Sequence, residues 1–184
     1  MRRDTLLFGA LVAALIAAVA AAYLYLAPAR PAAAPAGALP ADAGPRLLAA
    51  RYPDLAGKPQ ALAQWRGKTL VVNFWASWCA PCRQEMPAFS RLQAKYAGRA
   101  VQFVGIAVDS AANAAQFAQR QPPAYPLLVA DAAGVQLMRL TGNLSQGLPY
   151  TVVIERDGQA IFAHLGRLDE GQLDAVLAAH GAGQ

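Results

Sequence analysis

Cysteine and histidine are scarce in this sequence, and their scarcity limits the chemistry open to it. The 184 residues contain two cysteines, Cys79 and Cys82, and two histidines, His164 and His180. A four-ligand zinc site would need a second pair of ligands, and the histidines are distant and unpaired. A c-type haem motif is excluded because Arg83, and not histidine, follows Cys82. We therefore expect no bound metal or haem.

Charged residues are also few, at 15% of the chain. Residues 47–184 contain 12 basic and 9 acidic residues, a net charge of about +3, and the basic residues form no run. Domains that bind nucleic acid present a concentrated basic patch, so nucleic acid is not an expected partner. The sequence also has no internal repeat and no glycine loop of the kind that holds phosphate.

Residues 6–26 contain no charged side chain. A helix of this length extends about 32 Å, enough to cross the hydrocarbon core of a bilayer, about 30 Å thick. Arg2 and Arg3 precede the run, and positive residues stay on the cytoplasmic side of a membrane. We expect residues 1–5 to be a cytoplasmic N-terminus and residues 6–26 a single transmembrane anchor with Tyr23 and Tyr25 near its outer end.

Two other interpretations of residues 6–26 remain open. The segment can be a cleaved signal peptide, with Ala20-Ala21-Ala22 as the cleavage site. It can also be a buried helix of a soluble domain, although its length and basic flank argue against this. An anchor would place the protein in the inner (cytoplasmic) membrane with its C-terminal domain in the periplasm, and a signal peptide would release it to the periplasm.

The next segment, residues 27–46, contains five prolines among alanine and glycine. It has too little apolar bulk to fold, and its prolines favour an extended, semi-rigid spacer. The folded domain is therefore expected over residues 47–184.

Hydrophobic patterns in the domain predict strands that alternate with helices, followed by a hairpin and a last helix. The predicted strands are residues 70–75, 101–108, 127–130, 148–155 and 160–164; the predicted helices begin near residue 81 and cover 112–120, 135–140 and a segment capped by Asp169. Asp157-Gly158 supplies the hairpin turn. This order predicts an α/β sandwich around one sheet.

The Cys79-Ala80-Pro81-Cys82 motif lies where the first of these strands gives way to a helix. Free N–H groups and the positive end of the helix dipole favour a thiolate there. Two sulfurs three positions apart can alternate between dithiol and disulfide. A purely structural disulfide would close too short a loop to stabilise the fold much. The motif therefore predicts thiol–disulfide exchange.

The sequence from Asn73 to Pro87 resembles the membrane-anchored thioredoxin-like proteins of the TlpA, ResA and CcmG (DsbE) family. The resemblance covers roughly residues 50–180 and includes residues 147–151 and the hairpin turn. It implies an α/β thioredoxin fold, a central mixed sheet flanked by helices, with a central insertion between Cys82 and Pro149. It also implies an extracytoplasmic thiol–disulfide oxidoreductase whose redox group is the Cys79–Cys82 disulfide, without a further cofactor.

The same resemblance assigns roles to individual residues. Cys79 matches the nucleophile, Cys82 the resolving thiol, Pro149 the cis-proline beside the disulfide, and Glu85 a buried acidic residue of this subgroup. Cytoplasmic thioredoxins instead carry aspartate at the position of Asn73. We expect Glu85 to act as the base that deprotonates the resolving thiol, with its pKa raised by burial. An exposed helix residue is the alternative for Glu85.

The residues expected to position the substrate are Leu148, Pro149, Trp78 and Pro81. The backbone of Leu148 would pair with an extended peptide as an added strand, next to Pro149. Trp78 and Pro81 would lie beside the disulfide, with Trp75 and Trp78 forming part of an apolar wall.

The Ala80-Pro81 pair offers no charge or imidazole that would make the thiolate very acidic, so we favour a reductant. The resemblance implies client disulfides in cytochrome c maturation or metal-site assembly, and a membrane electron donor of the DsbD or CcdA type. Two alternatives stay open: a periplasmic dithiol oxidase or isomerase, and a non-catalytic module that carries Cu(I) on the two thiolates.

Overall fold

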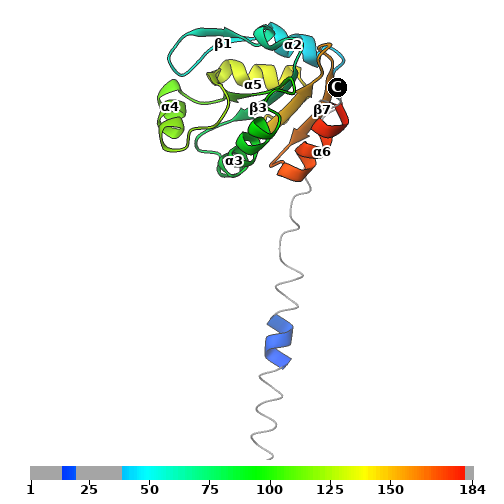
Figure 1. The fold of residues 1–184 in the computed structure, drawn as a ribbon. Helices are drawn as coiled ribbons and strands as arrows, with labels where there is room; N and C mark the ends of the chain where they lie inside the picture. Colours follow the sequence, from blue (N-terminus) through cyan, green and yellow to red (C-terminus); the bar gives the residue numbers. More distant parts are fainter. Residues whose placement is uncertain (1–13, 20–38, 181–184) are drawn as a thin grey trace, which may run out of the picture. The chain divides into compact units, whose positions relative to one another are not determined.

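The computed structural model describes residues 14–19 and 39–180 (Figure 1). Residues 39–180 are built on a five-stranded sheet in the order β5 (Leu127–Val129), β4 (Val101–Ala107), β3 (Thr69–Trp75), β6 (Tyr150–Ile154) and β7 (Ala160–Leu165). Strands β4 and β5 run parallel to β3, whereas β6 is antiparallel to β3 and β7 to β6. The sheet is therefore mixed, as the family resemblance implies.

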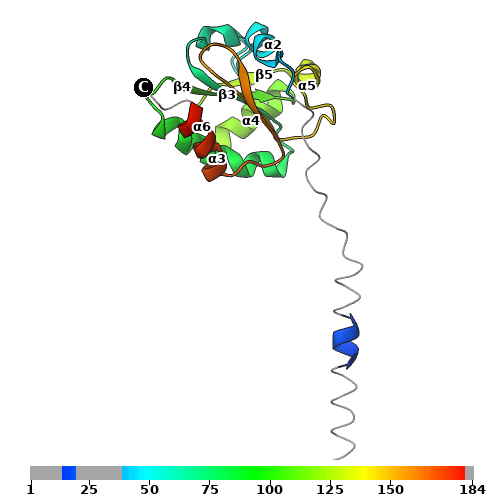
Figure 2. The same cartoon turned by 90° about the vertical axis from the view of Figure 1, so that its right-hand side faces the viewer.

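Successive side chains of a strand point to opposite faces of the sheet. Both faces of this sheet carry apolar side chains and are buried under helices. On β3, Val71 and Trp75 belong to one core cluster, while Leu70 and Phe74 belong to the other. The first cluster lies under α3 (Ala80–Lys95) and α6 (Glu170–His180) and the second under α2 (Ala43–Ala49) and α5 (Asp131–Leu140). Figure 2 shows the sheet between these two helical layers.

The elements predicted for residues 70–180 are all present. The segment between Cys82 and Pro149, where an insertion was expected, holds β4, α4 (Ala111–Arg120), β5 and α5. Helix α5 begins four residues earlier than its apolar pattern indicates, and β6 begins at Tyr150 because Pro149 has no N–H to contribute to a ladder. Strand β6 returns through a turn at Asp157-Gly158 to β7.

Residues 43–65 differ from the prediction. They form α2, a two-stranded antiparallel sheet of β1 (Arg51–Pro53) and β2 (Pro59–Ala61), and the 3-10 helix η1 (Leu62–Trp65). The interpretation of residues 27–46 as a spacer is wrong at residues 43–46, because these begin α2 and Ala43 and Gly44 are buried. Gly44 packs so closely against the hairpin turn that an added Cβ would lie 2.0 Å from the carbonyl oxygen of Gly158.

The predicted anchor lies mostly outside the described residues. Of residues 6–26 the structure describes 14–19, which are helical, and residues 1–5 and 27–38 also lie outside the description. In the part of the chain that is described, no helix has both the length and the apolar character needed to cross a membrane.

Candidate active site

Cys79 is the N-cap residue of α3, and Cys82 lies in the first turn of that helix. The two form a disulfide, and the Cys79 sulfur accepts a hydrogen bond from the backbone N–H of Cys82 at 3.3 Å. Cys79 keeps 5% of its surface exposed and Cys82 none. In the reduced protein the same free N–H groups and helix dipole would stabilise a Cys79 thiolate. Cys79 is thus the sulfur that a partner can approach first.

The loop before Cys79 is held by Asp109, at the end of β4. One carboxylate oxygen of Asp109 accepts hydrogen bonds from the backbone N–H of Ser77, at 2.9 Å, and from its hydroxyl. The other oxygen accepts from the backbone N–H of Ser110 and from the Asn113 amide. Burial alone would raise the pKa of Asp109, but these hydrogen bonds together lower it. From α3, Arg83 donates to the carbonyl oxygen of Ser77 at 2.7 Å.

Asp109 is not among the residues predicted from the sequence. The available signal was its place directly after a buried strand, since the carboxyl ends of parallel neighbours such as β3 and β4 meet at one edge of a sheet.

Glu85 is buried, with 1% of its surface exposed, so the alternative of an exposed helix residue is wrong. It lies one helical turn beyond Cys82, on the same face of α3. Its Oε1 accepts a hydrogen bond from the Asn73 amide at 2.8 Å, and its Oε2 accepts one from the backbone N–H of Leu168 at 3.0 Å. Burial raises the pKa of Glu85 to about 7, against the lowering effect of these hydrogen bonds and of the charge on Arg167.

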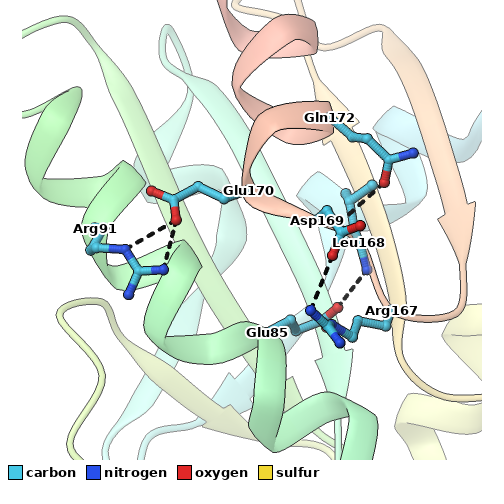
Figure 3. Close-up of polar contacts among 7 residues, drawn as sticks. All are labelled: Glu85, Arg91, Arg167, Leu168, Asp169, Glu170 and Gln172. Atoms are coloured by element: carbon cyan, nitrogen blue, oxygen red, sulfur yellow. Dashed lines mark hydrogen bonds and ion pairs between the residues drawn. The ribbon is translucent and has the colours of Figure 1, made fainter.

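Leu168 lies two residues before α6, and its N–H points to Glu85 of α3 (Figure 3). Arg91 of α3 forms an ion pair with Glu170 at 2.6 Å, and the Lys95 ammonium lies 2.7 Å from the Asp174 carboxylate. Both pairs join α3 to α6. They hold the segment that contains Leu168 against the helix that carries the Cys79–Cys82 disulfide and the Glu85 carboxylate.

Asn73 links this carboxylate to strand β6. Its amide nitrogen also donates to the Thr151 hydroxyl at 3.1 Å, and the two residues are paired in register. Both are buried. The Asn73 amide oxygen has no hydrogen-bond partner among the described residues. Thr151 lies two positions after Pro149, so one hydrogen-bonded chain connects the buried carboxyl group to the strand that follows the proline.

The Leu148–Pro149 peptide bond is cis, as the resemblance implies. Tyr150 pairs with Phe74 near the carboxyl end of β3 in the antiparallel β3–β6 ladder. Pro149 therefore lies at the same edge of the sheet as the loop that leads to Cys79. Leu148 is half-buried at this edge.

The two tryptophans near the motif differ in exposure. Trp78 is 67% exposed beside Cys79, and Pro81 is also exposed. Trp75 is fully buried, with its ring centroid 5.0 Å from that of Phe117. The expectation that Trp75 forms an apolar wall with Trp78 is therefore wrong, because Trp75 is a core residue.

The site contains two sulfurs, a buried carboxyl group with a pKa near neutrality and an exposed aromatic ring. Residues 14–19 and 39–180 contain no group of three or more histidine, cysteine, aspartate or glutamate side chains that could hold a metal ion. The chemistry that this arrangement supports is exchange of a disulfide at Cys79, with Cys82 as the second thiol.

The profile of the Redoxin family matches residues 34–177. The thioredoxin-like protein YneN of Bacillus subtilis is 32% identical over 127 residues, which cover 67% of this chain and 71% of YneN. The thiol-disulfide oxidoreductase ResA of Bacillus cereus is 29% identical over 126 residues, which cover 67% of this chain and 70% of ResA.

Two solved structures share the fold. A thiol:disulfide interchange protein of the thioredoxin family from Chlorobium tepidum superposes with a TM-score of 0.63 at 28% identity, covering 71% of this chain and 92% of the other. A thioredoxin-related protein from Neisseria meningitidis serogroup B superposes with a TM-score of 0.60 at 33% identity, covering 67% of this chain and 92% of the other.

Proposed function

The chain belongs to the Redoxin family and is a TlpA-, ResA- and CcmG-like thiol–disulfide oxidoreductase, and from this premise we propose that it reduces disulfides of client proteins outside the cytoplasm. The observation that carries the proposal is the placement of Cys79 at the N-cap of α3, with Cys82 fully buried behind it.

The exchange begins from the reduced protein. The Cys79 thiolate attacks one sulfur of the client disulfide, whose S–S bond breaks; a mixed disulfide forms on Cys79, and the other client sulfur leaves as a thiolate and takes a proton from water. Cys82 then loses its proton and attacks the Cys79 sulfur. The mixed disulfide breaks, the second client sulfur leaves as a thiolate, and the Cys79–Cys82 disulfide closes. Two electrons have passed from the protein to the client.

We assign the proton of Cys82 to the Glu85 carboxylate. A base works best when its pKa lies near the operating pH, and the pKa of Glu85 is about 7. Asn73 and Leu168 hold one oxygen each, which fixes the carboxyl group one turn from Cys82. The replacement Glu85→Gln removes the base, and we expect resolution of the mixed disulfide to slow by about 10²-fold or more.

The client is expected to bind across the edge that carries Pro149. The exposed ring of Trp78 supplies apolar contact beside Cys79, next to Pro81. The backbone of Leu148, which precedes β6 and is only half-buried, offers a place for an extended client segment to pair.

Direction, partners and location complete the proposal. The Ala80-Pro81 pair supports a reductant, and we propose clients in cytochrome c maturation or metal-site assembly and a DsbD- or CcdA-type membrane donor. The uncharged residues 6–26 support an inner-membrane anchor, or alternatively a signal segment, with the domain in the periplasm.

Trapping in cells tests this function directly. The variant Cys82→Ser should accumulate mixed disulfides through Cys79, which mass spectrometry would identify, while the matched variant Cys79→Ser should accumulate none. Absence of adducts while the wild type remains active would contradict the two-step exchange. A reduction potential above about −180 mV would instead indicate an oxidase or isomerase. Tight Cu(I) binding without insulin reduction would indicate the copper-carrying module.

A further inference from the structure

A groove lies beside the active-site loop. It has a volume of about 310 Å³, and its lining includes Ser77, Arg83, Gln116, Phe117 and Arg120. We refer to it as the arginine groove. Ser77 lies two residues before Cys79, and Arg83 directly follows Cys82, so one wall of the groove is the active-site loop itself. The other wall is α4. In Figure 1, α4 lies near one edge of the sheet, and β7 and α6 lie near the other edge.

The two arginines of the groove have no acidic partner among the described residues. Arg83 donates to the Ser77 carbonyl oxygen, and Arg120 donates to the backbone oxygen and the amide oxygen of Gln116, the latter at 2.9 Å. Both side chains are exposed. By contrast, Arg91 at the α3–α6 contact is paired with Glu170. The groove therefore presents two guanidinium groups that form no ion pair with a carboxylate in the described part of the chain.

Within residues 14–19 and 39–180, the carboxylate that hydrogen-bonds to residues of the groove is that of Asp109, and both of its oxygens are already engaged. Asp109 accepts hydrogen bonds from Ser77, Ser110 and Asn113 with both of its oxygens, and only 7% of the residue is exposed. The Asp109 carboxylate thus binds the active-site loop and the start of α4. The exposed charged groups of the groove are the guanidinium groups of Arg83 and Arg120.

The position of the groove relative to the sheet indicates what it meets. Strand β3 leads to Cys79, with β4 and the following α4 on one side and β6, preceded by Pro149, on the other. A client segment whose sulfur reaches Cys79 and whose backbone pairs near Leu148 would continue over Ser77 toward α4. The planar guanidinium group matches the geometry of a carboxylate.

We propose that the arginine groove binds an aspartate or glutamate side chain that flanks the disulfide of the client, and that it thereby selects acidic client segments. This inference rests on the proposed function, because it takes the client to be a protein disulfide. It adds the chemical class of the segment that is preferred.

Three disulfide substrates test the proposal with the reduced full-length protein. Two are peptides with one intramolecular disulfide, identical except that glutamate or glutamine flanks the cysteines, and the third is the small neutral compound 2-hydroxyethyl disulfide. We expect the wild type to reduce the glutamate peptide about three- to fivefold faster than the glutamine peptide, the effect of one exposed ion pair. The preference should disappear in 1 M salt, where the Debye length is about 3 Å.

Variants at α4 separate the groove from general attraction. Arg120→Gln should weaken the preference, because Arg83 remains in the groove, and should leave reduction of 2-hydroxyethyl disulfide unchanged. Arg120→Glu should abolish the preference. Arg66→Gln is the matched control. Arg66 is also exposed, and its replacement removes the same charge, but it lies at the end of η1 and not in the groove. Equal rates for the two peptides in the wild type, or equal loss in the Arg66 variant, would overturn the groove assignment. Failure to reduce any of the three substrates would instead refute the proposed function.

Discussion

The buried carboxyl group of Glu85 makes the stability of the oxidised protein depend on pH. Its pKa is about 7 in the folded protein, against 4.5 for an ordinary glutamate. Below pH 4.5 the group is protonated in both the folded and the unfolded chain and has no effect on their balance. Between pH 4.5 and 7 the unfolded chain loses this proton while the folded protein keeps it, so the free energy of unfolding falls as the pH rises.

The size of this loss follows from the difference in pKa. The pKa of Glu85 increases by about 2.5 on folding, and each pKa unit corresponds to about 1.36 kcal/mol. The loss in unfolding free energy above pH 7 is therefore about 3 kcal/mol. Glu85→Gln has no ionisable group at this position, so it should lack this part of the pH dependence. It also loses an acceptor, because its NH₂ group would face either the Asn73 amide or the Leu168 N–H. This second cost does not change with pH.

Urea denaturation of the oxidised wild type and of Glu85→Gln, at several pH values from 4.5 to 8, measures the effect. The difference in unfolding free energy between the two proteins should shift by about 3 kcal/mol in favour of the variant over this range. All other titrating groups cancel in this difference. Parallel curves for the two proteins would refute the elevated pKa and, with it, the assignment of Glu85 as a base poised near neutral pH.

Two further predictions concern the surroundings of this group and the edge of the fold. Asn73→Asp places a second carboxyl group against Glu85, and we expect the same denaturation series to show about 3–5 kcal/mol of additional destabilisation at pH 8, whereas Asn73→Ala should cost about 1–3 kcal/mol at every pH. Gly44→Ala should lower the unfolding free energy by about 1–3 kcal/mol because its Cβ would meet a backbone oxygen at 2.0 Å, while Gly171→Ala, with nothing within 4 Å of its Cβ, should be neutral or stabilising by up to about 1 kcal/mol.

The sequence predicts the central elements because their signals are local. Strands β3 and β4 are apolar on both faces, and Gly67 and Gly98 mark the boundaries before them. Residues 43–65 lack such signals: β1 and β2 have three residues each and both include a proline. Helix α2 follows a proline-rich segment and is stabilised by packing of Leu47 and Leu48 in the second core cluster, which composition alone does not reveal.

The residues of the candidate site also differ in whether a local signal marks them. The two cysteines, Glu85 and Pro149 stand in the contiguous motifs that carry the family resemblance, and the resemblance assigns the roles of Glu85 and Pro149. Asp109 and Thr151 were missed as site residues, because the contacts that give them a role join positions 32 and 78 residues apart. Such contacts depend on which strands are neighbours, and a single sequence does not specify that order directly.

Asn73 on strand β3 leaves Glu85 as the ionisable carboxyl group of this hydrogen-bonded chain. Asn73 on β3 donates to both Glu85 of α3 and Thr151 of β6 through the same amide nitrogen. Because an amide does not ionise, Glu85 titrates alone, and its pKa is set mainly by burial. Two carboxyl groups at these positions would share a proton and titrate as a pair. The combination of Asn73 with Glu85 thus gives the resolving thiol a single acceptor whose proton affinity lies close to neutral pH.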